Sequence, residues 1–193
     1  MRYFVAAAVI ALGLPPNGAS AHSPIVVNAD GNVARFYGVP IRLRISELKS
    51  LPYRVKMGHG YAEGERYTTA TINADGGVQV KVSFGPDGKL SVAGTASSNA
   101  VGPKGIGVGS LLSDVRAVWP NGRLLYGVEE NEANVTFITG TNVMYSFDPK
   151  DMPPRTFIDR GSVKAVPNIR VQSIRVSEGP VSVPDACVPG YCL

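Results

Sequence analysis

The segment Val78-Gln-Val-Lys-Val-Ser-Phe84 alternates apolar and polar side chains at every step. Four apolar residues share one side of an extended chain, while Gln79, Lys81 and Ser83 share the other side. This alternation is typical of an antiparallel strand with one buried face and one solvated face. The segment therefore predicts a sheet that packs against the rest of the protein on one side only.

Similar alternation recurs along the chain, between turns marked by Asp-Gly. Asn28-Ala-Asp30-Gly31 and Asn73-Ala-Asp75-Gly76 are near-copies of one hairpin signal, since Asp-Gly supplies the positive φ angles of tight turns. A change of phase near Gln172-Ser173 predicts a bulge in the last strand. Besides 78–84, we predict strands over 24–28, 33–37, 41–45, 53–58, 66–73, 89–96, 123–128, 134–139, 143–147 and 169–177.

Two short segments have helical spacing of apolar residues. Ser110 is predicted to cap a helix over 111–118, which Pro120 ends. The second helix is predicted over 46–51, with Pro52 as its stop. Together with the strands, these helices predict an α+β fold that consists of antiparallel sheet, in one or more sheets, with two short helices.

The two predicted helices have similar sequences. Ile45-Ser-Glu-Leu-Lys-Ser-Leu-Pro52 matches Leu112-Ser-Asp-Val-Arg-Ala-Val-Trp-Pro120 in residue type at an offset of 67, with one insertion before the proline. Each segment precedes three or four predicted strands. Two interpretations stay open: a tandem helix-plus-meander duplication, with repeats over 38–97 and 105–177, or chance similarity over eight residues.

The first 21 residues have the pattern of a secretory signal peptide. Arg2 precedes an apolar run over 4–14, and Ala19-Ser-Ala21 forms an A-x-A cleavage site. The alternative is a buried N-terminal helix. We predict cleavage after Ala21, which leaves one exported domain over 22–193 in the periplasm or secreted. No apolar run reaches the roughly 18 residues that a transmembrane helix needs.

Both cysteines lie close together near the C-terminus. Cys187 and Cys192 flank Pro189-Gly190, a strong turn signal. Because disulfides persist in exported proteins, we predict a Cys187–Cys192 bridge that stiffens a tail. The alternative is that the two cysteines form cross-links to other chains.

One segment of the second predicted repeat resembles a known family. Gly105-Ile-Gly-Val-Gly-Ser-Leu-Leu-Ser-Asp114-Val115 has a glycine, a five-residue step to an acid, then an aliphatic residue. Over 105–150 this pattern resembles beta-lactamase-inhibitor-like domains, a family that includes uncharacterised bacterial envelope proteins and an outer-membrane assembly lipoprotein. The family typically has Met-Thr where this chain has Ser110-Leu111. The resemblance implies helices packed on a sheet and protein binding in the envelope, and it identifies no catalytic residues.

Candidate chemistry is sparse, because the chain has only two histidines. After cleavage, His22 would provide an N-terminal amine and an imidazole, and His59 a second imidazole. Three such nitrogens suit copper, in an arrangement that resembles the histidine brace of lytic polysaccharide monooxygenases. The alternative is a solvated histidine at a chain terminus. We assign no catalytic residue and no cofactor.

The charge also limits the classes of partner. The formal net charge of +4 falls to +3 without Arg2, and the basic residues alternate along predicted strands instead of forming a patch for nucleic acid. We therefore predict a non-enzymatic protein-binding module of the envelope or exterior, whose protein partner is unknown. Two alternatives remain: a copper protein or oxidase that uses His22, and an inhibitor of a secreted enzyme.

Overall fold

The strands form two antiparallel sheets. The computed structural model describes residues 25–62, 64–129, 132–152 and 167–182. A three-stranded sheet has the order β1-β2-β3, and an eight-stranded sheet has the order β4-β5-β6-β7-β11-β10-β9-β8. The predicted antiparallel character is confirmed, and sheet dominates the fold.

Ten of the eleven predicted strands are present, with ends that differ by a few residues. The strands are β1 (Ile25–Val27), β2 (Val33–Phe36), β3 (Val39–Pro40), β4 (Arg54–Ala62), β5 (Glu65–Asn73), β6 (Gln79–Phe84), β7 (Leu90–Thr95), β8 (Arg123–Glu129), β9 (Glu132–Ile138), β10 (Val143–Phe147) and β11 (Val171–Ser177). The short helices are η1 (Ile45–Ser50), η2 (Asp75–Gly77), η3 (Pro103–Gly105), α1 (Leu112–Val118) and η4 (Pro149–Asp151).

The predicted strand over 41–45 is wrong. The chain turns after β3, where the Leu43 N–H donates to the Pro40 carbonyl at 3.3 Å. Ile41 and Leu43 are nevertheless buried, at 2% and 3% exposed. Ile41 and Leu43 alternate with Arg42 and Arg44 because every second side chain of this turn is buried, although the turn forms no continuous strand.

The predicted cap of α1 is also wrong. The Ser110 hydroxyl accepts the Gly107 N–H at 3.0 Å, and the Ser110 carbonyl accepts the Val171 N–H at 2.9 Å. Leu111 lies in extended backbone and forms a bridge with Arg170, next to β11, so the helix begins at Leu112. The Asp114 carboxylate instead accepts the Leu111 N–H at 3.1 Å, which satisfies one free donor at the helix start.

The eight-stranded sheet has two halves with the same element order. The first half is η1 followed by β4, β5, β6 and β7; the second half is α1 followed by β8, β9, β10 and β11. In the first half, Glu47 accepts the Arg44 N–H at 2.8 Å, as Asp114 accepts the Leu111 N–H in the second. The two acids are the ones that the sequence alignment pairs at the offset of 67.

In both halves the start of the helix is bonded to the segment that leads into the last strand of the same half. The Ile45 N–H donates to the Gly88 carbonyl at 3.0 Å, and the Leu112 N–H donates to the Ile169 carbonyl at 2.8 Å. The last strands also donate to the segments before the helices. The Leu90 N–H donates to the Leu43 carbonyl at 2.8 Å, and the Val171 N–H donates to the Ser110 carbonyl at 2.9 Å. Each helix is thereby fixed to the strand that ends its own meander.

A bulge occurs at the same place in each half. Phe84 pairs with Leu90 after a shift of register in the first half, and Phe147 pairs with Val171 after a shift in the second. Because Ser146 pairs with Ser173, Gln172 is the extra residue. The bulge predicted near Gln172-Ser173 is confirmed.

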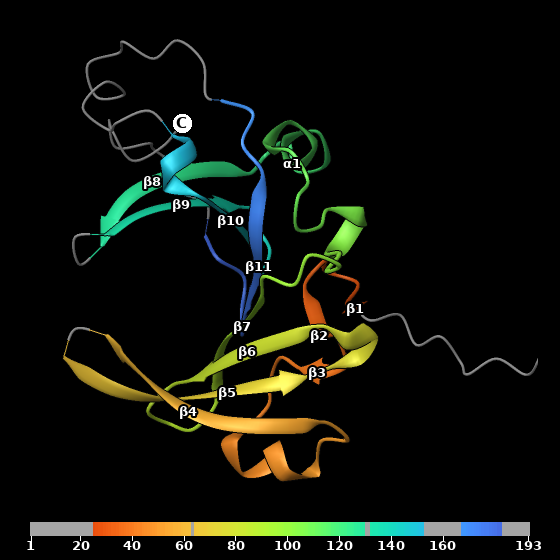
Figure 1. Cartoon of the computed structure of the whole chain (residues 1–193). Helices are drawn as coiled ribbons and strands as arrows, with labels where there is room; N and C mark the ends of the chain where they lie inside the picture. Colours follow the sequence, from red (N-terminus) through yellow and green to blue (C-terminus); the bar gives the residue numbers. More distant parts are fainter. Residues whose placement is uncertain (1–24, 63, 130–131, 153–166, 183–193) are drawn as a thin grey trace, which may run out of the picture.

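The two halves meet at β7 and β11. In Figure 1, β8, β9 and β10 lie above this junction and β4, β5 and β6 lie below it, while α1 and the small sheet lie to one side. Side chains on that side form the core, among them Val80, Phe84, Phe147 and Ile174. We call this the covered face of the sheet, and the opposite side the open face.

A buried amide joins the small sheet to the large one. Asn142 is 1% exposed. Its side-chain oxygen accepts the Val33 N–H at 2.8 Å, and its NH₂ group donates to the carbonyls of Val33 at 2.9 Å and Ser177 at 3.1 Å. Asn142 thus bonds β2 to the end of β11 and holds the small sheet over the covered face.

Candidate binding site on the open face of the sheet

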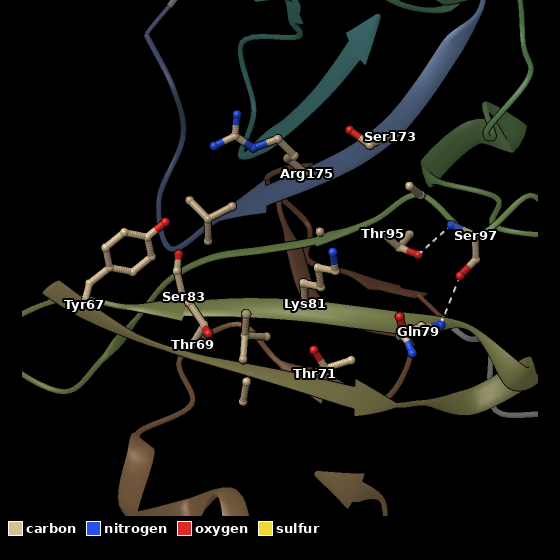
Figure 2. Close-up of a pocket in the computed structure, with 15 residues that line it drawn as sticks. Tyr67, Thr69, Thr71, Gln79, Lys81, Ser83, Thr95, Ser97, Ser173 and Arg175 are labelled. Carbon is tan, nitrogen blue, oxygen red and sulfur yellow. Dashed lines mark hydrogen bonds between the residues drawn. The ribbon is translucent and has the colours of Figure 1, made fainter. Parts of the chain in front are cut away.

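A hollow of about 680 Å³ lies on the open face of β5, β6, β7 and β11. Figure 2 shows Lys81 rising from β6 into this hollow, with Arg175 and Ser173 on β11 across it. Binding sites for small ligands commonly have volumes of roughly 300–1,000 Å³. The hollow is therefore large enough to hold a ligand or a segment of another protein.

The lining of the hollow follows from the alternation of apolar and polar side chains over 78–84. Val80, Val82 and Phe84 are buried on the covered face, so Lys81 and Ser83 must point to the open face. The same rule places Ser173 and Arg175 of β11 on the open face, because Ile174 is fully buried. The strands thus provide the polar lining through their ordinary two-residue period.

One residue from each strand forms a row across the open face. Directly opposite residues of antiparallel strands have side chains on the same face. We call the set the central row; in sheet order it consists of Lys56, Thr71, Lys81, Gly94, Arg175, Met144, Ile138 and Arg123. Four of the eight residues are cationic. Four consecutive residues of the row line the hollow: Thr71, Lys81, Gly94 and Arg175.

Hydroxyl groups make up much of the remaining lining. They belong to Tyr67, Thr69, Thr71, Ser83, Thr95, Ser97 and Ser173. Two of them are held by backbone hydrogen bonds, since the Gln79 N–H donates to Ser97 Oγ at 3.1 Å and the Ser97 N–H donates to Thr95 Oγ1 at 3.1 Å (Figure 2). The described residues that line the hollow include no Asp, Glu, His or Cys. The lining supplies hydrogen-bond donors and positive charge, without an acid–base pair or a set of metal ligands.

Glycines make room for larger side chains at two points of the open face. A Cβ at Gly60 would overlap the ring of Tyr67, so the tyrosine ring occupies the space above the glycine. A Cβ at Gly94 would lie 3.2 Å from the Ile174 carbonyl oxygen and 3.4 Å from Arg175 Cγ. Gly94 therefore leaves space for the stem of Arg175 at the middle of the central row.

The structure places the predicted site residues apart from this hollow or outside its description. His59 is exposed on the edge strand β4, opposite Thr68. Within the four described ranges, no three His, Cys, Asp or Glu side chains form a group that could hold a metal. His22, Cys187, Cys192 and the signal segment 1–21 lie outside the described residues, so the copper site, the disulfide and the cleavage stay predictions.

The sequence alone did not predict the central row, because the register between strands decides which residues meet. A signal was present in Met57-Gly-His-Gly60, where two glycines alternate at the end of the strand predicted over 53–58. Glycine inside a strand indicates close approach of another group, and Tyr67 and Thr69 pair with Gly60 and Gly58.

No helix in the described part of the chain is long and apolar enough to cross a membrane.

Comparisons with known proteins give distant structural similarity and no match at the level of a family or a curated protein. Among solved structures, the chain is similar to the crystal structure of the uncharacterized protein yfeY from Escherichia coli, with 16% sequence identity and a TM-score of 0.48. The similarity covers 71% of this chain and 90% of that chain.

Proposed function

We propose that this chain is an exported, non-enzymatic module that binds a partner protein on the open face of its sheet. The observation that supports this proposal is the hollow of about 680 Å³ over β5, β6, β7 and β11. Its lining combines hydroxyl groups with Lys81 and Arg175, which suits recognition by hydrogen bonds and charge. The signal pattern over 1–21 supports export.

We also propose that the two halves arose by duplication of a helix-plus-meander unit, with repeats over 38–97 and 105–177. The matched helix sequences support this proposal, as do the equivalent acids Glu47 and Asp114. The resemblance of residues 105–150 to beta-lactamase-inhibitor-like domains agrees with protein binding. Inhibition of a secreted enzyme would be one form of that function.

Photocrosslinking from the hollow tests the proposed function. The full chain, produced in its native cells, would have a photoreactive benzoylphenylalanine in place of Ser83, which lines the hollow. A matched variant would have it in place of Ser46, which is exposed on η1. We expect one predominant protein adduct from position 83, absent from position 46, and a one-to-one complex when the identified partner and this protein are purified and mixed.

Two results would contradict the proposal. One is the absence of any protein adduct from position 83 under conditions in which the variant is folded and exported. The other is the same set of adducts from both positions, since that pattern indicates contact without preference for the open face.

A further inference from the structure

We infer that the hollow binds an acidic peptide segment of the partner, with the segment's carboxylates lying along the central row from Lys56 to Arg175. This inference rests on the proposed function and specifies the chemistry of the contact. Three features of the open face support it: unpaired positive charge, the distance that this charge spans, and the absence of carboxylates among the described residues that line the hollow.

The cations of the central row from Lys56 to Arg175 are free to receive a ligand. Among the described residues, the ion pair is Lys89 with Asp87, whose Nζ and Oδ2 atoms lie 2.9 Å apart. Lys56, Lys81 and Arg175 make no ion pair and no side-chain hydrogen bond within that described part. The protein therefore leaves their charge to water or to a partner of opposite charge.

The spacing of the cations favours an elongated occupant over a single small anion. Lys56, Lys81 and Arg175 lie on alternate strands of the sheet. Since neighbouring strands are about 4.8 Å apart, the two outer backbones are separated by about 19 Å. Lys81 and Arg175 can converge on one carboxylate, but Lys56 needs a second one farther along the occupant.

The lining suits a peptide in particular. A carboxylate and a peptide carbonyl both accept hydrogen bonds, and the hydroxyls of Thr69, Thr71 and Ser83 can donate to them beside the cations. Glu65 shares the open face but lies at the start of β5, six residues from Thr71. Repulsion of an acidic segment by the hollow itself is thereby avoided.

The second half of the sheet limits where the charged part of the segment can lie. Across β10 and β9 the central row continues with Met144 and Ile138, of which Ile138 is 6% exposed. These side chains offer no charge to a carboxylate. The acidic part of the segment therefore lies over the first half and the junction of β7 with β11.

Binding of defined peptides to the purified full chain tests this inference. The probe is a fluorescent peptide of about ten alternating glutamate and glycine residues, which spans about 33 Å when extended. The matched peptide has glutamine in place of glutamate. We expect fluorescence anisotropy to detect binding of the glutamate peptide alone, with affinity that falls as salt rises.

Charge-reversal variants locate the binding. Lys81→Glu and Arg175→Glu should each weaken binding of the glutamate peptide by about tenfold, because an attraction becomes a repulsion. Lys49→Glu makes the same change of net charge on η1, outside the hollow, and should leave the affinity within about twofold. Circular dichroism checks that all three variants are folded.

Several results would overturn the inference. These are equal binding of the two peptides, equal loss of affinity in the Lys49→Glu variant, or binding of heparin or polyphosphate in the absence of peptide binding. Adding Lys81→Glu to the Ser83 crosslinking experiment separates the two proposals. If the adduct from position 83 persists unchanged in the Lys81→Glu variant, the acidic segment is refuted and the protein-binding function stands. If position 83 gives no adduct even when Lys81 is intact, the protein-binding function is refuted.

Discussion

The two halves of the large sheet share a backbone design and differ on the open face. Both begin with a short helix that an acid caps, both fix that helix to their last strand, and both have a bulge between their third and fourth strands. On the open face, however, Thr71 and Lys81 of the first half correspond to Ile138 and Met144 of the second. The polar hollow accordingly lies over the first half and the junction of β7 with β11.

The two halves also differ on the open face where β7 pairs with β11. Gly94 and Arg175 occupy equivalent places on β7 and β11 and lie directly opposite each other. An arginine in place of Gly94 would compete with Arg175 for the same space, because a Cβ at Gly94 would already lie 3.4 Å from Arg175 Cγ. The covered face and the helix contacts therefore constrain the backbone of both halves, whereas the open face is free to differ between them.

The largest expected effect comes from the phenylalanines at the two bulges. Phe84 and Phe147 are 2% and 3% exposed, so Phe84→Ala and Phe147→Ala should each lower the free energy of unfolding by about 4 kcal/mol. Urea denaturation followed by circular dichroism measures the effect. If the halves form one cooperative unit, both variants unfold in a single transition; two separate transitions would contradict that unity.

A smaller loss is expected where the second half is joined to the small sheet. Asn142→Ala leaves the buried N–H and carbonyl of Val33 without partners, and should cost about 3 kcal/mol. Gln79 occupies the equivalent place in the first half and is exposed, so Gln79→Ala should cost less than about 0.5 kcal/mol. Equal losses in the two variants would show that Asn142 does not have the structural role inferred from its hydrogen bonds.

Two buried tyrosines test how much a hydrogen-bonded hydroxyl group contributes to the free energy of unfolding. The Tyr37 hydroxyl accepts the Val101 N–H at 2.6 Å and donates to the Val101 carbonyl at 3.0 Å, so Tyr37→Phe should cost about 2 kcal/mol. The Tyr145 hydroxyl and the Trp119 indole N–H are both buried without a well-formed hydrogen bond among the described residues, and burial raises the pKa of Tyr145 more than the nearby Trp119 indole lowers it. Tyr145→Phe should leave stability unchanged or raise it by up to about 1 kcal/mol. A clear loss in thermal denaturation of Tyr145→Phe would contradict this account.

The smallest effects are expected at the helix caps. Glu47→Ala and Asp114→Ala each remove one acceptor for an exposed backbone N–H, and should each cost about 1 kcal/mol. Glu47→Gln and Asp114→Asn keep a side-chain oxygen and should lose less. If the amide and alanine variants lose the same free energy of unfolding, the stabilisation comes from the charge of the acid alone and not from its hydrogen bond. A marked difference between the two alanine variants would weaken the equivalence of η1 and α1.

The sequence predicted the local structure well and the long-range structure less well. Alternation and Asp-Gly turns were enough to identify ten strands, because both depend on residues close together in the chain. The cap of α1 was missed since pairing of Ser110 with Val171 comes from a distant strand. The side of β6 that faces solvent was predicted, but Thr71, Gly94 and Arg175 could not be named as neighbours of Lys81, because alternation contains no information about register.

The pairing of β7 with β11 has a consequence for how the protein folds. Gly94 and Arg175, which meet at the middle of the sheet, are separated by about 80 residues in sequence, so joining them requires closure of a long loop. Each meander can form earlier from neighbouring strands, whereas the middle of the sheet must wait for its most distant segments. The hollow over this junction is therefore completed only when β11, the last strand of the described chain, has paired with β7.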